Sequence, residues 1–267
     1  MQAVLKYPGA KNRLVSWILQ YIPQKCVYVE PFAGSLAVLL NKERSHIETV
    51  NDLNSNIVNF FRVLRDQPDK LSHLIAYTPY AREEYDLAFQ ESEDPIEKAR
   101  RFAVRCWMAF GCGNRYHNGF RSGKGMNSPN PAKAWSLLPE TIAEAAHRLH
   151  GVQIEHMDGI ELIKRYNNTD VFLYLDPPYL PSTRKPYLYA DEMDEEQHIA
   201  LLQVITEHKG MILLSGYDNQ LYEKYLSNWH KVSKKSQAEN GKIRTETLWM
   251  NYEPADTQLA LEDFLMF

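Results

Sequence analysis

Cysteine is scarce in this sequence, and long apolar runs are missing from it. The chain of 267 residues has three cysteines, Cys26, Cys106 and Cys112, an odd number at irregular intervals. This usage fits a reducing compartment better than a disulfide framework. No segment reaches the roughly 18 uninterrupted apolar residues of a membrane span, and the N-terminal residues lack the apolar core of a signal peptide. The sequence therefore predicts a cytoplasmic protein that does not cross a membrane.

The patterns of two common kinds of binding site are missing as well. A Gly-x-Gly-x-x-Gly run is absent, which disfavours a dinucleotide-binding site. Cys106, Cys112 and His117 match no zinc-ligand spacing, and Cys106 lies among apolar residues as a core cysteine does. We expect no metal site.

Acidic residues are absent from one long stretch, although the chain as a whole is acidic. The net charge of -4 argues mildly against nucleic-acid binding. Residues 98–133 nevertheless contain no Asp or Glu, and the basic residues there are Lys98, Arg100, Arg101, Arg105, Arg115, Arg121, Lys124 and Lys133. A second basic cluster comprises Lys231, Lys234, Lys235, Lys242 and Arg244. This distribution indicates a basic face on an acidic body.

Short strand patterns alternate with helical patterns at both ends of the chain but not in its middle. The strand patterns lie at residues 27–30, 49–52, 152–155, 171–175, 211–215 and 246–252. From about Ser55 to His150, helical patterns dominate. This order predicts an α/β fold with a doubly wound, mostly parallel sheet. Residues 1–54 and 151–267 would build the sheet, and residues 55–150 would form an inserted, mainly helical domain.

The segment from Val171 to Tyr179, Val-Phe-Leu-Tyr-Leu-Asp-Pro-Pro-Tyr, combines a strand with an abrupt stop. Its five apolar or aromatic residues predict a strand that is buried on both faces. Pro177 and Pro178 remove two backbone donors and hold Asp176 in a stiff loop at the carboxyl end of the strand. Ligands bind at this edge of open α/β sheets, although a purely structural Pro-Pro turn is the alternative.

This loop contains the groups that would activate an exocyclic amine on a conjugated ring. Such an amine is a poor nucleophile because its lone pair is delocalised. Asp176 and the Pro177 carbonyl can each accept one amine N–H, which favours a pyramidal nitrogen, and Tyr179 offers a stacking face for the ring. Residues 215–218, after the next strand, either border the same pocket or form a plain turn in which Asp218 caps a helix.

Other strand ends have turns and acids that suit a ligand. The first strand runs into Pro31–Ser35 and a leucine-rich segment, which we expect to form a helix whose N-terminal N–H groups face a ligand. Asp52 ends the second strand and suits the hydroxyls of a ribose, and Asp158 ends the third. An ordinary βα turn at residues 30–34 is the alternative interpretation.

Glycine and proline gather in a loop between Gly111 and Pro131. Loops of this length in a compact chain are usually functional or disordered. Its segment from Asn114 to Gly125 interleaves aromatic and basic residues, which suits phosphate contacts and the entry of an aromatic side chain into a DNA groove. The alternative is a solvated surface loop.

These segments resemble the motifs of the Dam-type DNA adenine-N6 methyltransferases, both in their residues and in their order along the chain. The resemblance rests on residues 6–11 (Lys-Tyr-Pro-Gly-Ala-Lys), 29–34 (Val-Glu-Pro-Phe-Ala-Gly), 51–54 (Asn-Asp-Leu-Asn), Asp158, 176–179 (Asp-Pro-Pro-Tyr) and 244–252 (Arg-Thr-Glu-Thr-Leu-Trp-Met-Asn-Tyr). It spans nearly the full chain and is weakest from about Thr78 to His150. It implies a class I methyltransferase fold, which is Rossmann-like, with an inserted target-recognition domain and S-adenosylmethionine as cofactor.

The resemblance also implies roles for individual residues. The residues near the cofactor would be Tyr7, Lys11, Glu30, Pro31, Phe32, Ala33, Gly34, Ser35, Asp52, Asp158 and Asp176. Asp52 would hold the ribose hydroxyls, and Asp158 would accept a hydrogen bond from the adenine amine of the cofactor. The catalytic clamp around a target adenine flipped out of the duplex would comprise Asp176, Pro177, Pro178 and Tyr179.

For the contacts with DNA we expect Lys11, Arg115, Asn118, Arg121 and Lys124. The chain departs from the family pattern at Leu36, where members often have a second glycine. Its central loop is also shorter than that of family members that recognise GATC, and the loop differs from theirs in sequence. The resemblance therefore does not imply their target sequence for this chain.

The sequence thus predicts a site-specific DNA adenine-N6 methyltransferase that acts on double-stranded DNA by direct in-line methyl transfer, without a metal. We expect it in the cytoplasm of a bacterial or phage-infected cell, at the nucleoid, with a restriction endonuclease as a candidate partner. Two alternatives are an RNA or protein-amide methyltransferase and a catalytically silent DNA-binding regulator with the same fold. Protein-amide enzymes typically have Asn in place of Asp176, and the basic insertion favours a polynucleotide.

Overall fold

The computed structural model describes residue 1 and residues 3–111, 116–123, 125, 129–183, 191–237 and 243–254, without the side chains of residues 236, 237 and 243. All structural statements below concern these residues.

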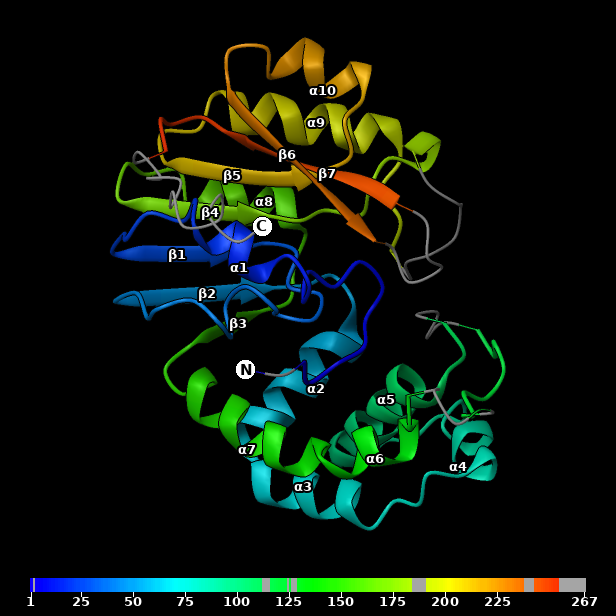
Figure 1. The fold of residues 1–267 in the computed structure, drawn as a ribbon. Helices are drawn as coiled ribbons and strands as arrows, with labels where there is room; N and C mark the ends of the chain where they lie inside the picture. Colours follow the sequence, from blue (N-terminus) through cyan, green and yellow to red (C-terminus); the bar gives the residue numbers. More distant parts are fainter. Residues whose placement is uncertain are drawn as a thin grey trace, which may run out of the picture.

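A seven-stranded sheet forms the centre of the described structure, in the order β3-β2-β1-β4-β5-β7-β6 (Figure 1). Its strands are β1 (Val27–Glu30), β2 (Ile47–Asn51), β3 (Gln153–Glu155), β4 (Val171–Leu175), β5 (Met211–Gly216), β6 (His230–Gln237) and β7 (Ile243–Met250). The strands β1 to β5 pair in parallel, whereas β7 is antiparallel to β5 and to β6. The predicted doubly wound, mostly parallel sheet is confirmed. Its strand order reverses between β1 and β4, where such folds bind ligands.

The central strand β4 shows why the sheet needs a layer on each face. All its residues are buried. Phe172 and Tyr174 belong to one buried cluster, whereas Leu173 and Leu175 belong to the other, as the two-residue period of a strand requires.

Helices cover both faces of the sheet (Figure 1). One face packs against α8 (Gly159–Arg165), α9 (Glu195–Thr206) and α10 (Gln220–Tyr225), and the other against α1 (Val15–Leu19). A short 3₁₀ turn, Pro181–Thr183, follows β4. No helix in the described ranges has both the length and the apolar character that crossing a bilayer requires.

The helices between β2 and β3 lie beyond the edge of the sheet formed by these two strands (Figure 1). They are α2 (Ser55–Asp66), α3 (Pro68–Ala76), α4 (Arg82–Leu87), α5 (Pro95–Met108), α6 (Pro131–Ser136) and α7 (Leu138–Leu149). In α2, the buried residues Ile57, Phe60 and Leu64 recur at helical spacing and belong to the same buried cluster as the α1 face of the sheet. The helical part therefore packs on the sheet directly, and its division from the rest at residues 54 and 151 stays a prediction.

Residues 36–42 do not form the helix that was predicted after the first strand. They form turns that begin at Leu36, whose φ is 55°, and Gly34 two residues earlier has a φ of 50°. Two left-handed positions so close together prevent the regular backbone of a helix start. Leu39 and Leu40 are nevertheless buried, which accounts for the helix-like apolar spacing. A ligand at this edge would meet a turn and not a helix N-terminus.

The strand β6 was not predicted from the sequence. It is an edge strand that pairs with β7 alone, and Lys231, Lys234 and Lys235 lie on it. Edge strands often carry lysine, which hides the apolar alternation used to recognise strands. The helix after β5 also differs in detail, because Asn219 caps it and Asp218 instead pairs with Lys231.

Candidate active site

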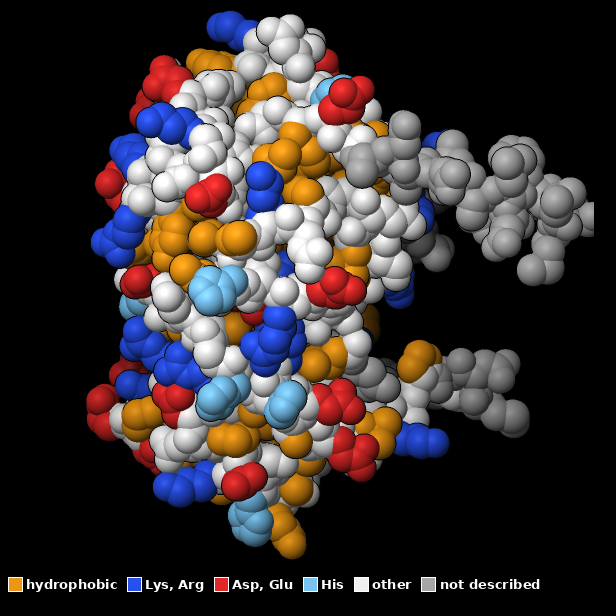
Figure 2. Space-filling view, turned by 90° about the vertical axis from the view of Figure 1, so that its left-hand side faces the viewer, with side chains coloured by type: hydrophobic (Ala, Val, Ile, Leu, Met, Phe, Trp, Pro, Cys, Tyr) orange, Lys and Arg blue, Asp and Glu red, His pale blue; other side chains and the backbone are white. Residues whose placement is uncertain are grey.

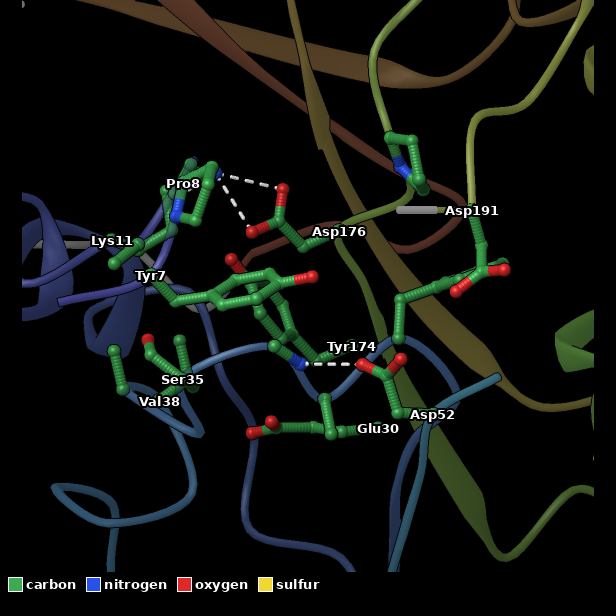
Figure 3. A pocket seen from close by; sticks show the side chains of 17 residues that line it. Tyr7, Pro8, Lys11, Glu30, Ser35, Val38, Asp52, Tyr174, Asp176 and Asp191 are labelled. Atoms are coloured by element: carbon green, nitrogen blue, oxygen red, sulfur yellow. Dashed lines mark hydrogen bonds and ion pairs between the residues drawn. The ribbon is translucent and has the colours of Figure 1, made fainter. Parts of the chain in front are cut away.

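A pocket opens at the carboxyl ends of β1, β2 and β4 (Figure 3). The residues that line it are Tyr7, Pro8, Gly9, Ala10, Lys11, Glu30, Phe32, Ala33, Gly34, Ser35, Ala37, Val38, Asp52, Tyr174, Asp176, Pro178 and Asp191. The pocket thus lies at the switch point of the sheet and brings together most of the residues predicted to bind the cofactor.

Asp176 follows β4 directly and lies at the wall of the pocket between two partners. Both of its carboxylate oxygens are 2.7 Å from Lys11 Nζ (Figure 3). The Ser215 hydroxyl, at the end of β5, donates to Oδ1 at 2.8 Å. The two prolines after Asp176 end the strand, so its carboxylate is fixed at the sheet edge by backbone and by side-chain contacts.

Lys11 is buried and reaches the pocket from the N-terminal loop. In that loop Pro8 precedes Gly9, whose φ is 73°, and the Ala10 N–H donates to the Tyr7 carbonyl, as in a type II turn. Lys11 Nζ donates to the Gly9 carbonyl at 2.9 Å. The predicted placement of Lys11 at the pocket is therefore explained by a local turn that the sequence specifies.

Glu246 of β7 completes a buried charged group on the same wall. Its carboxylate accepts a hydrogen bond from the Tyr179 hydroxyl and lies 3.7 Å from Lys11 Nζ. Burial raises the pKa of Glu246, while Lys11 and Tyr179 act in the opposite direction. Lys11 Nζ also lies 4.9 Å from the centre of the Tyr179 ring. Glu246 thus fixes both the cation and the aromatic ring beside Asp176.

Tyr217, after β5, packs edge-on against Tyr179 with ring centres 4.6 Å apart. The Arg244 guanidinium lies 5.6 Å from the centre of the Tyr217 ring. The segment after β5 therefore borders the Asp176 wall, as one of the two interpretations of residues 215–218 proposed.

Two buried carboxylates lie in the other half of the pocket. Asp52 accepts a hydrogen bond from the backbone N–H of Gly34 at 2.9 Å (Figure 3). It accepts another from the backbone N–H of Asn54, also at 2.9 Å. Burial raises the pKa of Asp52 to about 6. Glu30 accepts from the Tyr28 hydroxyl at 2.5 Å, and burial raises its pKa to about 7. Both groups can accept hydrogen bonds from a ligand, and a cationic ligand would favour their charged forms.

Phe32 lines the pocket beside the first residue of α8. A Cβ added to Gly159 would lie 2.7 Å from the Phe32 ring, so only glycine permits this approach. The side chain of Asn51 holds the same loops together, because it donates to the Pro31 carbonyl and accepts from the Met157 N–H, each at 2.9 Å. The loops after β1, β2 and β3 are therefore tied to one another around the pocket.

The remaining predicted cofactor and catalytic residues lie close to the pocket without lining it. Asp158 is exposed and caps α8, with Oδ1 accepting from the backbone N–H groups of Ile160 and Glu161. Pro31 contributes its carbonyl to Asn51, and Pro177 precedes the lining residue Pro178.

The residues predicted to contact DNA differ in how the structure places them. Arg115 and Lys124 lie outside the described residues, as does Cys112. Arg121 donates from Nε to the Ala109 carbonyl and from Nη2 to the Gly111 carbonyl, each at 3.0 Å. The Asn118 N–H donates to the Tyr85 hydroxyl at 3.1 Å. Arg121 therefore closes the base of the central loop.

The cysteine and histidine residues weighed as metal ligands have other environments where they are described. Cys106 is buried in the core, and His117 lies 2.6 Å from an Asp86 carboxylate oxygen on the surface. No group of three or more potential metal ligands occurs within the described ranges.

The sequence did not indicate a role for three residues at the pocket or its wall, namely Tyr174, Asp191 and Glu246. Glu246 reaches the wall beside Asp176 because β7 lies next to β5, which in turn lies next to β4 in the sheet. Tyr174 had been seen as a core residue of its strand, and its position two residues before Asp176 was the available signal. No sequence pattern marked Asp191 as a pocket residue, because it lies in a loop.

Comparison with known proteins agrees with the geometry. The family model for D12 class N6 adenine-specific DNA methyltransferases matches residues 7–239. The Type II methyltransferase M1.LlaDCHI of Lactococcus lactis subsp. cremoris is 27% identical over 278 residues, which cover 92% of this chain and 94% of that protein. The DNA adenine methylase of Escherichia coli strain K12 is 24% identical over 285 residues, which cover 95% and 96%. A solved structure, a putative RNA methyltransferase from Pyrococcus horikoshii, aligns with a TM-score of 0.39 at 10% identity and covers 92% of this chain and 84% of that one.

Proposed function

The chain belongs to the D12 class N6 adenine-specific DNA methyltransferases, and we propose that it moves a methyl group from S-adenosylmethionine directly to the N6 amine of an adenine flipped out of duplex DNA. One observation carries the proposal. The Asp176 carboxylate lies at the wall between the pocket and Tyr179, at the switch point of the sheet. An acceptor, an aromatic ring and a pocket lined by carboxylates thus occur at one edge of the sheet.

The residues of the pocket fit S-adenosylmethionine. A carboxylate has about four acceptor positions, and Asp52 uses two of them for backbone N–H groups, which leaves capacity for ribose hydroxyls. Glu30 is a buried carboxylate suited to the positive part of the cofactor. Tyr7, Lys11 and residues 31–35 would enclose it, with Asp158 at the adenine end. When bound, the cofactor supplies an electrophilic methyl group on a sulfonium.

Asp176 would hold the target amine. One amine N–H would bind to its carboxylate and the other to the Pro177 carbonyl, so the nitrogen lone pair would point toward the cofactor. Lys11 occupies both oxygens of Asp176 in this structure, and the amine would replace one of these contacts. The amine would lose one proton when its nitrogen takes the methyl group, and Asp176 would be the adjacent acceptor for that proton.

Tyr179 would hold the adenine ring. Its hydroxyl is bound to Glu246 and its ring is packed by Tyr217, so its orientation is fixed before DNA arrives. A stacked and paired adenine cannot present its amine in line with a methyl donor, which is why flipping is required.

Duplex DNA would approach from the side on which the pocket opens. Lys11, Arg115, Asn118, Arg121 and Lys124 are the proposed contacts. The face of the molecule on the left of Figure 1 interleaves acidic and basic side chains over both sheet and helices, without a large area of one sign (Figure 2). That face therefore lacks the continuous positive field that a DNA backbone favours.

We also propose a division of the chain into domains, a cellular location and a partner. Residues 1–54 and 151–267 would form the catalytic domain, with target recognition in residues 55–150. The enzyme would work in the cytoplasm of a bacterial or phage-infected cell, at the nucleoid, and a restriction endonuclease is a candidate partner.

The test is incubation of the protein with methyl-labelled S-adenosylmethionine and duplex DNA of mixed sequence, followed by nucleoside analysis. We expect label on N6 of adenine in DNA. Label on cytosine, or on RNA alone, would overturn the proposal.

A further inference from the structure

A second pocket lies outside the cofactor site, between α2 and α5. It is lined by the first turn of α2, the segment that joins α4 to α5, and one side of α5. Its basic lining residues are Arg62, Lys98, Arg101 and Arg105, and its acidic ones are Glu91 and Glu93. Positive charge is therefore in excess, although the chain as a whole is acidic.

Arg105 is the residue of this pocket whose charge is least compensated. Its Nε is shielded from solvent and has no hydrogen-bond partner among the described residues. Its Nη2 reaches the Asn56 Oδ1 at 3.4 Å, beyond the usual length of a strong N–H···O bond. Burial lowers the pKa of Arg105. A guanidinium that is partly withdrawn from water without an anion is costly, and a bound anion would lower this cost.

The neighbouring arginines of α5, unlike Arg105, pair with carboxylates. Arg100 binds Glu84 and Glu97, and Arg101 binds Glu97 at 2.7 Å. Arg105 has two aromatic rings in place of an acid, with the centres of Phe89 and Phe102 at 5.8 and 5.5 Å from its guanidinium carbon. These rings hold the guanidinium at the pocket wall but do not neutralise it.

The first turn of α2 adds positive potential to the same pocket. Ser55 and Asn56 line it, the helix has 12 residues, and its first turn contains no acidic residue. The backbone N–H groups of residues 56–58 already bind Asn54, so the contribution of this turn is the helix dipole, which attracts anions. Arg62, two turns further along α2, is exposed and lines the pocket as well.

From these observations we propose that the pocket between α2 and α5 is a phosphate-binding site, in which Arg105 and Arg62 bind the phosphate oxygens. Phosphate fits because guanidinium groups pair with its oxygens in fixed geometry. The group comes either from the DNA backbone or from a small free phosphate. The DNA source rests on the proposed methyltransferase function, whereas the free source does not.

The site is adjacent to the ribose end of the cofactor pocket. Asn54 caps α2 and follows Asp52 by two residues. His156 lines the phosphate pocket and binds the Leu53 carbonyl at 3.1 Å. A phosphate bound here would therefore steady the turn that presents Asp52.

The first experiment measures the unfolding temperature of the full chain in inorganic phosphate and in chloride of equal ionic strength. The variants are Arg105→Met, which retains an unbranched chain between Phe89 and Phe102, and Arg62→Gln, which alters an exposed side chain. Lys70→Gln, an exposed change of the same charge outside the pocket, is the matched control. For a site open to free phosphate, the extra stabilisation by phosphate is lost in both pocket variants and kept in the control.

The second experiment measures the affinity for a DNA duplex as a function of salt. Each phosphate contact contributes about -0.9 to the slope of log affinity against log salt. For a site that takes a backbone phosphate, Arg62→Gln and Arg105→Met each reduce the slope by up to about one unit, and Lys70→Gln leaves it unchanged.

A loss of phosphate stabilisation with an unchanged DNA slope identifies a free phosphate as the ligand, and a reduced slope identifies the DNA backbone. If Arg62→Gln changes neither measurement relative to Lys70→Gln, the inference is overturned. A wild-type protein without methyl transfer to DNA would overturn the proposed function while leaving the first experiment valid.

Discussion

Lys11 lies between the carboxylates of Asp176 and Glu246, which would have different roles. It binds Asp176 through both oxygens at 2.7 Å and lies 3.7 Å from Glu246. When the target amine takes one of the Asp176 contacts, Glu246 would retain the displaced ammonium group in the wall of the site. Glu246 is thus a positioning residue that acts through Lys11 and Tyr179.

Replacing Glu246 with glutamine tests this role. Glu246→Gln keeps an oxygen for the Tyr179 hydroxyl but removes the charge that holds Lys11. Hydrogen bonds to charged groups contribute about 1.5–3 kcal/mol, so we expect kcat/KM for DNA to fall roughly tenfold or more. Glu223→Gln, at the exposed pair with Lys231, is the control. An unchanged kcat/KM with an unchanged fold would show that Glu246 is structural only.

The buried Glu30 predicts a pH dependence of stability. Burial raises its pKa from 4.5 to about 7, so the folded protein binds this proton more tightly than the unfolded chain does. The contribution to stability is fully present below pH 4.5 and is lost as the pH rises through 7. Glu30→Gln should therefore show a weaker decline of the unfolding free energy across this window, measured by urea unfolding without cofactor. Glu144→Gln, an exposed change, serves as control, and equal pH slopes in all three proteins would contradict the assignment.

At the scale of elements, the site depends on how the loop after β1 meets the start of α8. Gly159→Ala would place a methyl group 2.7 Å from the Phe32 ring and force the ring toward the pocket. We expect weaker binding of S-adenosylmethionine by calorimetry, with part of the loss recovered in the double variant Gly159→Ala, Phe32→Leu. Independent, additive effects of the two changes would contradict a direct clash.

Most strands could be predicted from the sequence because burial on both faces leaves a clear apolar signature. Val171–Leu175 is the clearest case, and its Asp-Pro-Pro stop was visible too. β6 has no such signature because lysines lie on it and one of its edges is unpaired. The helix predicted for residues 36–42 was wrong for the opposite reason, because buried leucines in turns have the spacing of a helical face.

The site could be predicted where a pocket residue lies near its own strand end, as Asp52 and Asp176 do. Glu246 could not be assigned, because its place beside Asp176 depends on the order of β4, β5 and β7 across the sheet. Arg121 looked like a surface cation, and only the folded loop shows its bonds to two carbonyls.

At the scale of the whole molecule, a buried ion pair joins the helical part to the sheet. Arg148 of α7 binds Glu48 of β2 through two nitrogens, at 2.5 and 2.8 Å, and Lys42 adds a third contact at 2.8 Å. Both partners of the arginine pair are nearly inaccessible to solvent. Movement of α7 relative to the sheet would therefore break strong contacts.

Removing one partner of this pair should destabilise the fold. Arg148→Met leaves Glu48 with the Lys42 ammonium group and the Ser45 N–H, and breaking a buried pair costs about 3–5 kcal/mol. Arg165→Met, which removes a more exposed contact with Glu155 at 3.6 Å, should cost at most about 1 kcal/mol. Denaturant unfolding measures both, and similar small losses for the two variants would contradict the coupling of α7 to β2.

The most direct test of the account is the single-turnover rate of methyl transfer to duplex DNA by Asp176→Ala. Asp176 would bind the amine that is methylated. We therefore predict a fall of roughly 10²–10³ in rate, as for the loss of one transition-state hydrogen bond. Affinities for duplex DNA and S-adenosylmethionine, measured in parallel, should change far less. A rate within a few-fold of wild type, with both ligands bound, would contradict the assignment of the Asp-Pro-Pro-Tyr turn as the adenine clamp.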